Sequence, residues 1–197
     1  MLVDEGKMAW DDHPRKHVPG FKLHDALADA NVTLRDLVAH RTGLGRHDCL
    51  WYNSAWSSEE LLAKLPHLPL TYSFRSAYQY NNLMYMVAGL AVESASGMPW
   101  ADFVRTRILE PLGMTRTTLS VNDLECAGNY CTPHEMDEDK VVTFRWSNLD
   151  SVNACGSIIS CARDLSAWIR FQLGDGEWKG KRLVSQERLA ETHSPQM

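Results

Sequence analysis

The chain has 197 residues, 44% of them hydrophobic and 23% charged, which is typical of a globular protein with a sizeable core. Its net charge of −5, without any basic run, excludes the electrostatic footprint of a nucleic-acid-binding protein, so no nucleic-acid partner is expected. No apolar run approaches the ~20 residues of a membrane-spanning helix, and we expect no membrane span in this segment.

The first expected element is the end of a helix in residues 1–8 (MLVDEGKM). Apolar Leu2 and Val3 precede Gly6, and glycine is common just past a helix end. The body of such a helix is not in this sequence. We therefore interpret the chain as a fragment of a longer protein.

Two short helices are predicted from capping boxes. Thr33 is a good N-cap for a helix over residues 34–40, with the acid of Asp36 in its first turn. Ser57 opens a second short helix in the same way, and Pro66 closes it.

Residues 74–90 change from a polar, aromatic-rich loop into the strongest helix pattern of the chain. Asn82 stands at the changeover, where we expect it to be the N-cap, and Gly97 is the expected stop. Apolar residues recur at the spacing of one helix face, at Leu83, Met86, Val87, Leu90 and Ala91.

The later elements are predicted from apolar periodicity, stop residues and β propensity. Helices are expected from Pro99 to just before Pro111, over residues 162–173 and over 186–192; strands are expected over 114–119, 140–146 and 157–160, with loop over 120–139.

The triplet Tyr80-Asn81-Asn82 places a phenol and an amide two residues apart at a helix entrance, where both can point into one cleft. A phenol can move a proton, and an amide can bind a polar substrate group through both its C=O and its NH2. The alternative is a packed tyrosine beside an N-cap asparagine, which is the commoner meaning of an isolated Tyr-x-Asn.

Metal and cofactor sites are not predicted. His13 and His17 are four residues apart, but Pro14 between them argues against a regular helix face. No pair of the five cysteines has CxxC spacing, and no glycine-rich phosphate loop is present. We expect no metal, no cofactor, and surface or structural roles for all eight histidines. Cys126 and Cys131 either form a small disulfide or, as the pattern favours, stay free thiols.

A nucleophile is not evident from the sequence. There is no Gly-x-Ser-x-Gly elbow, and no serine is followed three residues later by lysine. The nearest arrangement is Ser160 followed by Arg163, but arginine does not deprotonate in proteins and cannot act as a base. The residues alone therefore offer one acid/base candidate, Tyr80, and no obvious nucleophile.

Five segments, in order along the chain, carry a family resemblance. They are residues 5–12 (EGKMAWDD), 32–44 (VTLRDLVAHRTGL), 74–89 (FRSAYQYNNLMYMVAG), 111–115 (PLGMT) and 154–165 (ACGSIISCARDL). Together they resemble the beta-lactamase-related serine hydrolases: class C beta-lactamases, low-molecular-weight penicillin-binding proteins, and the esterases and D-aminopeptidases that share their fold. Each match is weak alone, but five in the right order are specific together.

The resemblance implies an α+β fold, a partial serine beta-lactamase or penicillin-binding-protein fold made mostly of its helical domain with a few strands of the antiparallel sheet. It implies one incomplete domain over residues 1–197, with a helical subdomain at about 20–150 and part of the α/β subdomain at about 151–197. Without the remaining strands of the sheet, the faces that pack on them would be uncovered. We therefore expect residues 1–197 on their own to be marginally stable or to associate. The oligomeric state and the compartment are not predicted.

The resemblance also implies roles for single residues. Tyr80 matches the catalytic tyrosine that shuttles protons between nucleophile, leaving group and water, and Asn82 matches the asparagine that holds the substrate's amide. The family's Ser-x-x-Lys nucleophile would lie before Met1, and its Lys-Thr-Gly or His-x-Gly strand after Met197. Cys155 replaces a glycine of the family pattern, which we interpret as a local packing change and not as a new nucleophile.

The implied function is hydrolysis of an ester, a beta-lactam or a D-amino-acid peptide, that is, a small-molecule or peptide acyl substrate, through an acyl-enzyme. Substrate choice is expected in loops such as residues 45–74 and 120–146, where Trp51, Tyr52 and Trp56 either line the site or simply pack. The alternative function is that of a truncated, non-catalytic relative that binds a partner or is inactive. A tyrosine needs a neighbouring cation to act near neutral pH. Without the family's lysine, we predict no acyl turnover by residues 1–197 alone.

Overall fold

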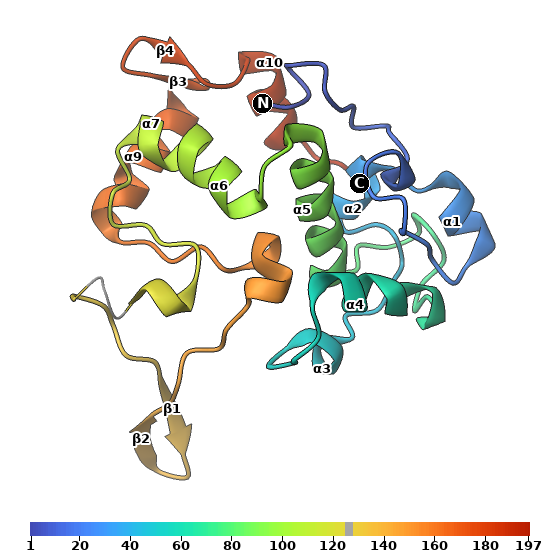
Figure 1. Ribbon diagram of the computed structural model, residues 1–197, viewed down its shortest axis with the longest axis horizontal. Helices are drawn as coiled ribbons and strands as arrows, with labels where there is room; N and C mark the ends of the chain where they lie inside the picture. The colour runs from blue at the N-terminus through green and yellow to red at the C-terminus, as the bar shows by residue number, and fades with distance from the viewer. Residues whose placement is uncertain (125–127) are drawn as a thin grey trace.

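The longest helix of the described chain is α5 (Asn82–Ser96), which lies at the centre of the helical part of the molecule (Figure 1). The structure is a computed structural model that describes residues 1–124 and 128–197. α5 confirms the helix predicted after the Tyr-x-Asn triplet, because the apolar face formed by Leu83, Met86 and Val87 is buried. The helix ends at Gly97, whose φ of 71° is the left-handed conformation that glycine adopts easily.

The N-cap of α5 is Asn81, and the prediction of Asn82 was wrong. The Asn81 side chain accepts a hydrogen bond from the Met84 amide at 3.0 Å, while Asn82 is already the first helical residue. Both positions hold asparagine, so local propensity does not separate them. The NH2 group of Asn81 also donates to the carbonyls of Leu44 and Gly45, and this tertiary contact decides which asparagine caps.

Short helical elements precede α5 in the chain: η1 (Pro14–Lys16), α1 (Ala26–Asn31), α2 (Leu34–Val38), α3 (Asp48–Trp51), α4 (Ser58–Lys64) and η2 (Leu65–His67). Both predicted capping boxes are confirmed, since Thr33 caps α2 with Asp36 and Ser57 caps α4 with Glu60. α2 ends two residues earlier than predicted because His40 has a positive φ of 56°, which no helix contains.

The helical elements after α5 are α6 (Trp100–Val104), η3 (Arg105–Leu109), α7 (Glu110–Leu112), η4 (Val121–Asp123), η5 (Asp150–Cys155), α9 (Ala162–Leu173) and α10 (Gln186–Thr192). α9 and α10 confirm the helices predicted over residues 162–173 and 186–192. The expected stop before Pro111 was wrong, because proline is tolerated in the first turn of a helix and here lies inside α7.

The described residues form two separate antiparallel hairpins. β1 (His134–Asp137) pairs with β2 (Lys140–Thr143), and β3 (Glu177–Trp178) pairs with β4 (Lys181–Arg182). β2 confirms the first part of the strand predicted over residues 140–146, whereas β1 lies in a stretch predicted to be loop.

The strands predicted over residues 114–119 and 157–160 were wrong as regular strands. The two segments do meet, but only through one bridge, in which Thr118 and Ile159 exchange N–H···O bonds of 2.9 Å each. A ladder becomes stable when further strands extend it. Within the described residues no other strand pairs with either segment, so each stays irregular.

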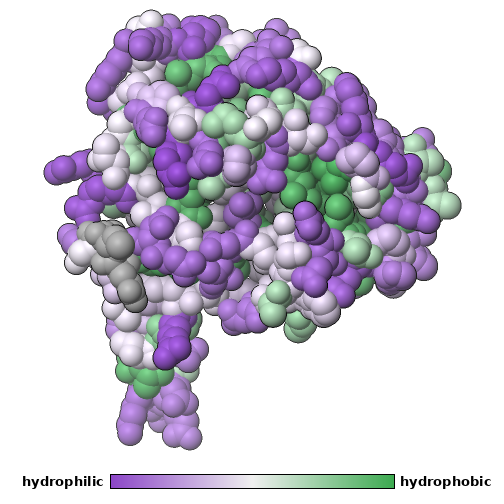
Figure 2. Space-filling view, in the orientation of Figure 1, coloured by the Kyte–Doolittle hydropathy of each residue, from purple (hydrophilic) through white to green (hydrophobic). Residues whose placement is uncertain are grey.

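The β1–β2 hairpin projects away from the helices (Figure 1). We call residues 133–144 the arm, since the Phe144 amide closes its base on the Pro133 carbonyl at 3.1 Å. Met136 and Val141 face each other across the two strands and are both exposed. Figure 2 shows that the tip of this hairpin is hydrophilic and that apolar surface lies just above it.

The start of the chain confirms the predicted helix end. The Lys7 amide donates to the Leu2 carbonyl and the Gly6 amide to the Val3 carbonyl, each at 3.0 Å, which is the hydrogen-bond pattern of a glycine-terminated helix. Among the helices of the described residues, none has the length and apolar character needed to cross a membrane.

Candidate active site

The predicted site begins with residues 75–81, here called the Tyr80 loop, which lead into α5. Hydrogen bonds hold this loop on residues 36–45, here called the supporting segment. The Gln79 amide donates to the His40 carbonyl at 2.7 Å, and the Asn81 amide donates to Nδ1 of the His40 ring at 3.1 Å. The course of the loop is therefore set by a segment that is distant in sequence.

Gly43 permits a close approach between the supporting segment and the chain that precedes the Tyr80 loop. Its carbonyl accepts hydrogen bonds from the Thr71 and Tyr72 amides at 2.9 and 3.2 Å. Its φ is +83°, and a Cβ at this position would lie 2.2 Å from the Tyr72 carbonyl oxygen. The position thus requires glycine both for its backbone conformation and for space.

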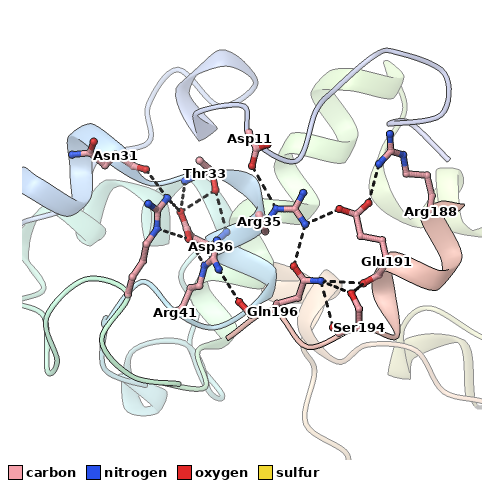
Figure 3. Close-up of polar contacts among 11 residues, drawn as sticks. Asp11, Asn31, Thr33, Arg35, Asp36, Arg41, Arg188, Glu191, Ser194 and Gln196 are labelled. Atoms are coloured by element: carbon pink, nitrogen blue, oxygen red, sulfur yellow. Dashed lines mark hydrogen bonds and ion pairs between the residues drawn. The ribbon is translucent and has the colours of Figure 1, made fainter.

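Asp36 is a buried carboxylate that ties the Tyr80 loop to the supporting segment (Figure 3). Arg75 donates to its two oxygens at 2.9 and 2.7 Å, and Arg41 donates to the same carboxylate and to the Gln196 carbonyl. Burial disfavours the charge. The hydrogen bonds from Arg75, the Thr33 backbone and Arg41 outweigh that effect and hold the pKa of Asp36 below its ordinary value.

Tyr80 has a ring that is held in place and a hydroxyl that is free. Its ring centroid lies 4.6 Å from that of His40, and the guanidinium carbon of Arg46 lies 5.1 Å from the Tyr80 ring centroid. The side chain is 37% exposed. Its hydroxyl has no hydrogen-bond partner among residues 1–124 and 128–197.

Asn82, the second predicted site residue, lies one residue beyond the cap in the first turn of α5. The residue is 7% exposed, and its side chain makes no hydrogen bond to any residue that the structure describes. Its amide atoms are not among the fully buried polar atoms, so its donors and its acceptor are open to solvent or to a ligand. The neighbouring Asn81 amide, by contrast, is fully occupied inside the protein.

Sequence reasoning missed two residues that contact the Tyr80 ring, His40 and Arg46. His40 was grouped with the other histidines as surface or structural, because no local pattern distinguished it. A second tyrosine beside His40 is Tyr85, which is engaged internally: its hydroxyl donates to the Val38 carbonyl at 3.2 Å, and burial raises its pKa. Of these two tyrosines, only Tyr80 therefore offers an unpaired hydroxyl.

Two hollows meet at Tyr52. An open one of about 550 Å³ is lined by Arg46, Trp51 and Tyr52, among others, and so adjoins the cation that covers the Tyr80 ring. The other, of about 240 Å³, lies between Tyr52 and the aromatic side chains Phe144 and Trp146.

The three aromatic residues predicted either to line the site or to pack, Trp51, Tyr52 and Trp56, make different contacts. Trp51 is buried in the core around α5, Tyr52 lines both hollows, and Trp56 packs against Lys64, whose ammonium lies 3.6 Å from the Trp56 ring centroid. Of the three, only Tyr52 is both outside the core and next to the cation beside Tyr80.

The cysteines and histidines form no second centre in the described part of the chain. Cys155 is half-buried against the core, and burial raises its pKa to about 11, so it stays a protonated thiol at neutral pH. Cys126, the proposed disulfide partner of Cys131, lies outside the described residues. Within residues 1–124 and 128–197, no group of three or more His, Cys, Asp or Glu side chains could hold a metal ion.

Comparisons with known proteins agree on one family. The family model described as Beta-lactamase matches residues 1–197. An unguisins hydrolase from Aspergillus campestris is 28% identical over 180 residues, which cover 85% of this chain and 34% of the relative. Penicillin-binding protein 4* from Bacillus subtilis is 26% identical over 189 residues, which cover 84% of this chain and 39% of the relative. The chain thus spans between a third and two fifths of these relatives.

Solved structures show the same fold. The octameric penicillin-binding protein homologue from Pyrococcus abyssi superposes with a TM-score of 0.81 at 22% identity, over 98% of this chain and 44% of that one. The D-amino acid amidase from Ochrobactrum anthropi, complexed with L-phenylalanine amide, gives a TM-score of 0.76 at 24% identity, over 96% and 53%. The expected partial fold, mostly helical with few antiparallel strands, is confirmed.

Proposed function

Because this chain belongs to the beta-lactamase family, we propose that it is part of a serine hydrolase that cleaves an acyl substrate through an acyl-enzyme. The relatives named above are a hydrolase, a penicillin-binding protein and an amidase, which supports hydrolytic chemistry at the level of the family. The chemistry proposed for single residues rests on their geometry.

In this proposal Tyr80 and Asn82 keep the roles predicted for them. Tyr80 accepts the proton of a serine Oγ as that oxygen attacks the substrate carbonyl, and it passes this proton to the leaving group as the bond to that group breaks. Water then cleaves the acyl-serine ester and returns a proton to the serine Oγ through Tyr80, which releases the acid. Asn82 binds the amide beside the scissile bond through its C=O and NH2. No Ser-x-x-Lys spacing occurs in residues 1–197, and the proposal therefore assigns the serine and its lysine to a segment outside them.

One observation carries the proposal: the hydroxyl of Tyr80 and the amide of Asn82 lack partners within the described residues, although polar groups of three neighbours, Asn81, His40 and Tyr85, are hydrogen-bonded inside the protein. Asn81 uses both ends of its amide, His40 accepts from two amides, and Tyr85 donates to a carbonyl. Unpaired polar groups held by a fixed loop are available to bind a substrate.

The proposed substrates are amides or esters of amino acids and short peptides. The relative solved with L-phenylalanine amide supports this class, since it belongs to the same fold and holds an amino-acid amide. Beta-lactams, which are cyclic amides, are a second substrate class that the same acyl-enzyme chemistry would open.

The test uses the protein isolated from its source. Its intact mass is compared with 22.3 kDa, and it is labelled with a fluorophosphonate and with a fluorescent penicillin. We expect a larger mass and a labelled serine outside these residues. Tyr80→Phe should lower kcat/KM by ~10²-fold or more, because a positioned acid/base contributes ~10²–10⁴.

Two further variants sharpen the result. Asn82→Ala should lower kcat/KM for amide substrates more than for ester substrates. Tyr72→Phe, at an exposed tyrosine outside the site, should leave kcat/KM unchanged. A native mass of 22.3 kDa without any labelled serine would instead identify a non-catalytic relative and refute the hydrolase.

A further inference from the structure

We infer that His40 is a positioning residue for Tyr80: its neutral ring fastens the Tyr80 loop to the supporting segment, and protonation of that ring releases the loop. The consequence for turnover rests on the proposed function. The fastening itself does not, because it follows from hydrogen bonds and ring contacts inside this chain.

The hydrogen bond from Asn81 fixes the state of the His40 ring. A backbone N–H can only donate, so Nδ1 of His40, 3.1 Å from the Asn81 nitrogen, must be the acceptor and carry no proton. A neutral ring then has its proton on Nε2. The Asn81 amide is itself buried, which makes the loss of its partner costly.

The His40 ring also sets the plane of the Tyr80 ring. Three tyrosine rings surround it, with centroid distances of 4.6 Å to Tyr80, 4.9 Å to Tyr85 and 5.5 Å to Tyr78. His40 is only 7% exposed, and Tyr85 is stacked on it at an interplanar angle of 27°. Because the Tyr85 hydroxyl is hydrogen-bonded to the Val38 carbonyl, the His40 ring cannot tilt without moving a partly buried neighbour that is itself held.

Protonation removes the fastening. An imidazolium has two N–H donors and no acceptor, so the Asn81 amide would face another donor across 3.1 Å. The groups that face the ring are the phenols of Tyr78, Tyr80 and Tyr85, with the Arg46 cation over the Tyr80 ring. Asp36, the buried acid of the supporting segment, is already paired with two arginines. These surroundings favour the neutral ring.

The direction of the pH effect follows from burial, which lowers the pKa of His40 from its ordinary value of 6.5. Between 6.5 and the lowered pKa, the unfolded chain binds a proton that the folded protein does not, so stability falls as the pH falls through this window. Above 6.5 the contribution is fully present. Below the lowered pKa the folded protein is also protonated, and the loop is released.

The first test needs no enzymatic activity. Imidazole ¹⁵N shifts of the full protein are followed from pH 8 to pH 5 by NMR. We expect an unprotonated Nδ1 and a protonated Nε2 for His40 at pH 8, a midpoint below the ordinary value of 6.5, and a shift of the Asn81 amide signal at the same midpoint. A proton on Nδ1 at pH 8, or a His40 titration that leaves the Asn81 amide unmoved, would overturn the inference.

The second test uses substitution and activity. Asparagine places its Oδ1 where histidine has Nδ1 and tolerates a positive φ, so His40→Asn keeps the acceptor but cannot titrate. We expect its kcat at pH 8 to stay within ~10-fold of the wild type. In the wild type, kcat should decrease as His40 is protonated at acid pH (the acid loss), and this decrease should be absent from His40→Asn. His40→Ala should lower kcat by ~10²-fold, the scale of a 1 Å misplacement, with a smaller change in KM. His67→Asn is the control and should match the wild type.

The outcomes separate the two proposals. If the NMR result holds but the protein hydrolyses no substrate, the proposed function fails and the positioning role stands. If the protein is active but His40→Asn keeps the acid loss of the wild type, the positioning role fails and the proposed function stands.

Discussion

The Tyr80 loop and the arm both lie between helices, yet they are held in opposite ways. The Tyr80 loop is fastened by backbone bonds to His40, by the Asn81 side chain and by two arginines on a buried acid. The arm is a two-stranded hairpin whose central pair, Met136 and Val141, is 65% and 67% exposed. One excursion is fixed by tertiary contacts, and the other by its own local pairing.

The difference shows where this fold can support chemistry that depends on geometry. Proton transfer and amide binding need side chains held within fractions of an ångström, and the Tyr80 loop provides that through partners distant in sequence. The arm presents surface instead, with Phe144 and Trp146 near its base lining the smaller hollow beside Tyr52. The fixed region suits catalysis, and the projecting region suits contact with variable groups.

The largest expected effect comes from removing the buried acid. Asp36→Ala should destabilise the protein by about 3–5 kcal/mol, since it leaves Arg41 and Arg75 without their partner. Urea unfolding measures the change. Asp137→Ala, on the exposed arm, is the matched control and should stay within about 0.5 kcal/mol. Equal losses at the two positions would show that the two excursions are not held differently.

A smaller effect is expected from glycine substitutions that share a positive φ. Gly180→Ala, in the β3–β4 turn with φ +78° and open space around it, should cost about 1–2 kcal/mol for the backbone alone. Gly43→Ala adds a methyl group against the Tyr72 carbonyl and should cost at least about 1 kcal/mol more. The difference in melting temperature between the two variants measures the cost of the contact between the added methyl group and the Tyr72 carbonyl. Identical melting temperatures would show that the supporting segment moves aside without cost.

The smallest effect is expected in the arm. Met136→Ser breaks the cross-strand pair with Val141, whose contribution is about 0.2–1 kcal/mol to the hairpin itself. Global unfolding in urea should change by less than about 0.5 kcal/mol, because neither side chain enters the core. A loss of unfolding free energy above about 2 kcal/mol would show that the arm stabilises the whole protein, and the difference between the arm and the Tyr80 loop would then not hold.

The sequence predicted what depends on neighbours in the chain. Thr33 and Ser57 were identified as caps because a capping box is complete within four residues, and α5 and α9 because each carries a continuous apolar face. It failed where distant residues decide. Asn81 caps α5 because it also reaches Leu44, and residues 114–119 stay irregular because a single bridge is all that Ile159 offers.

The same distinction between local and distant contacts applies to the residues of the candidate site. Tyr80 and Asn82 were selected by the Tyr-x-Asn spacing and the family resemblance, and their roles stay predictions. His40 and Arg46 were missed because their contacts with Tyr80 arise only when the supporting segment folds under the loop. The subdomain division near residue 150 also stays a prediction, since the structure shows how η5 packs on α5 but not where an independent unit begins.

The Asp36 carboxylate has a consequence for the order in which the chain folds. Its capping bonds with Thr33 and its ion pair with Arg41 are local, but two of the hydrogen bonds that compensate burial of its charge come from Arg75, 39 positions further along the chain, so Asp36 cannot be fully compensated before the Tyr80 loop is in place. We therefore expect α2 and the Tyr80 loop to form, and to open, as one cooperative unit. The amides of Asp36 and Gln79 should then exchange their hydrogens with a common opening free energy, although each belongs to a different local structure.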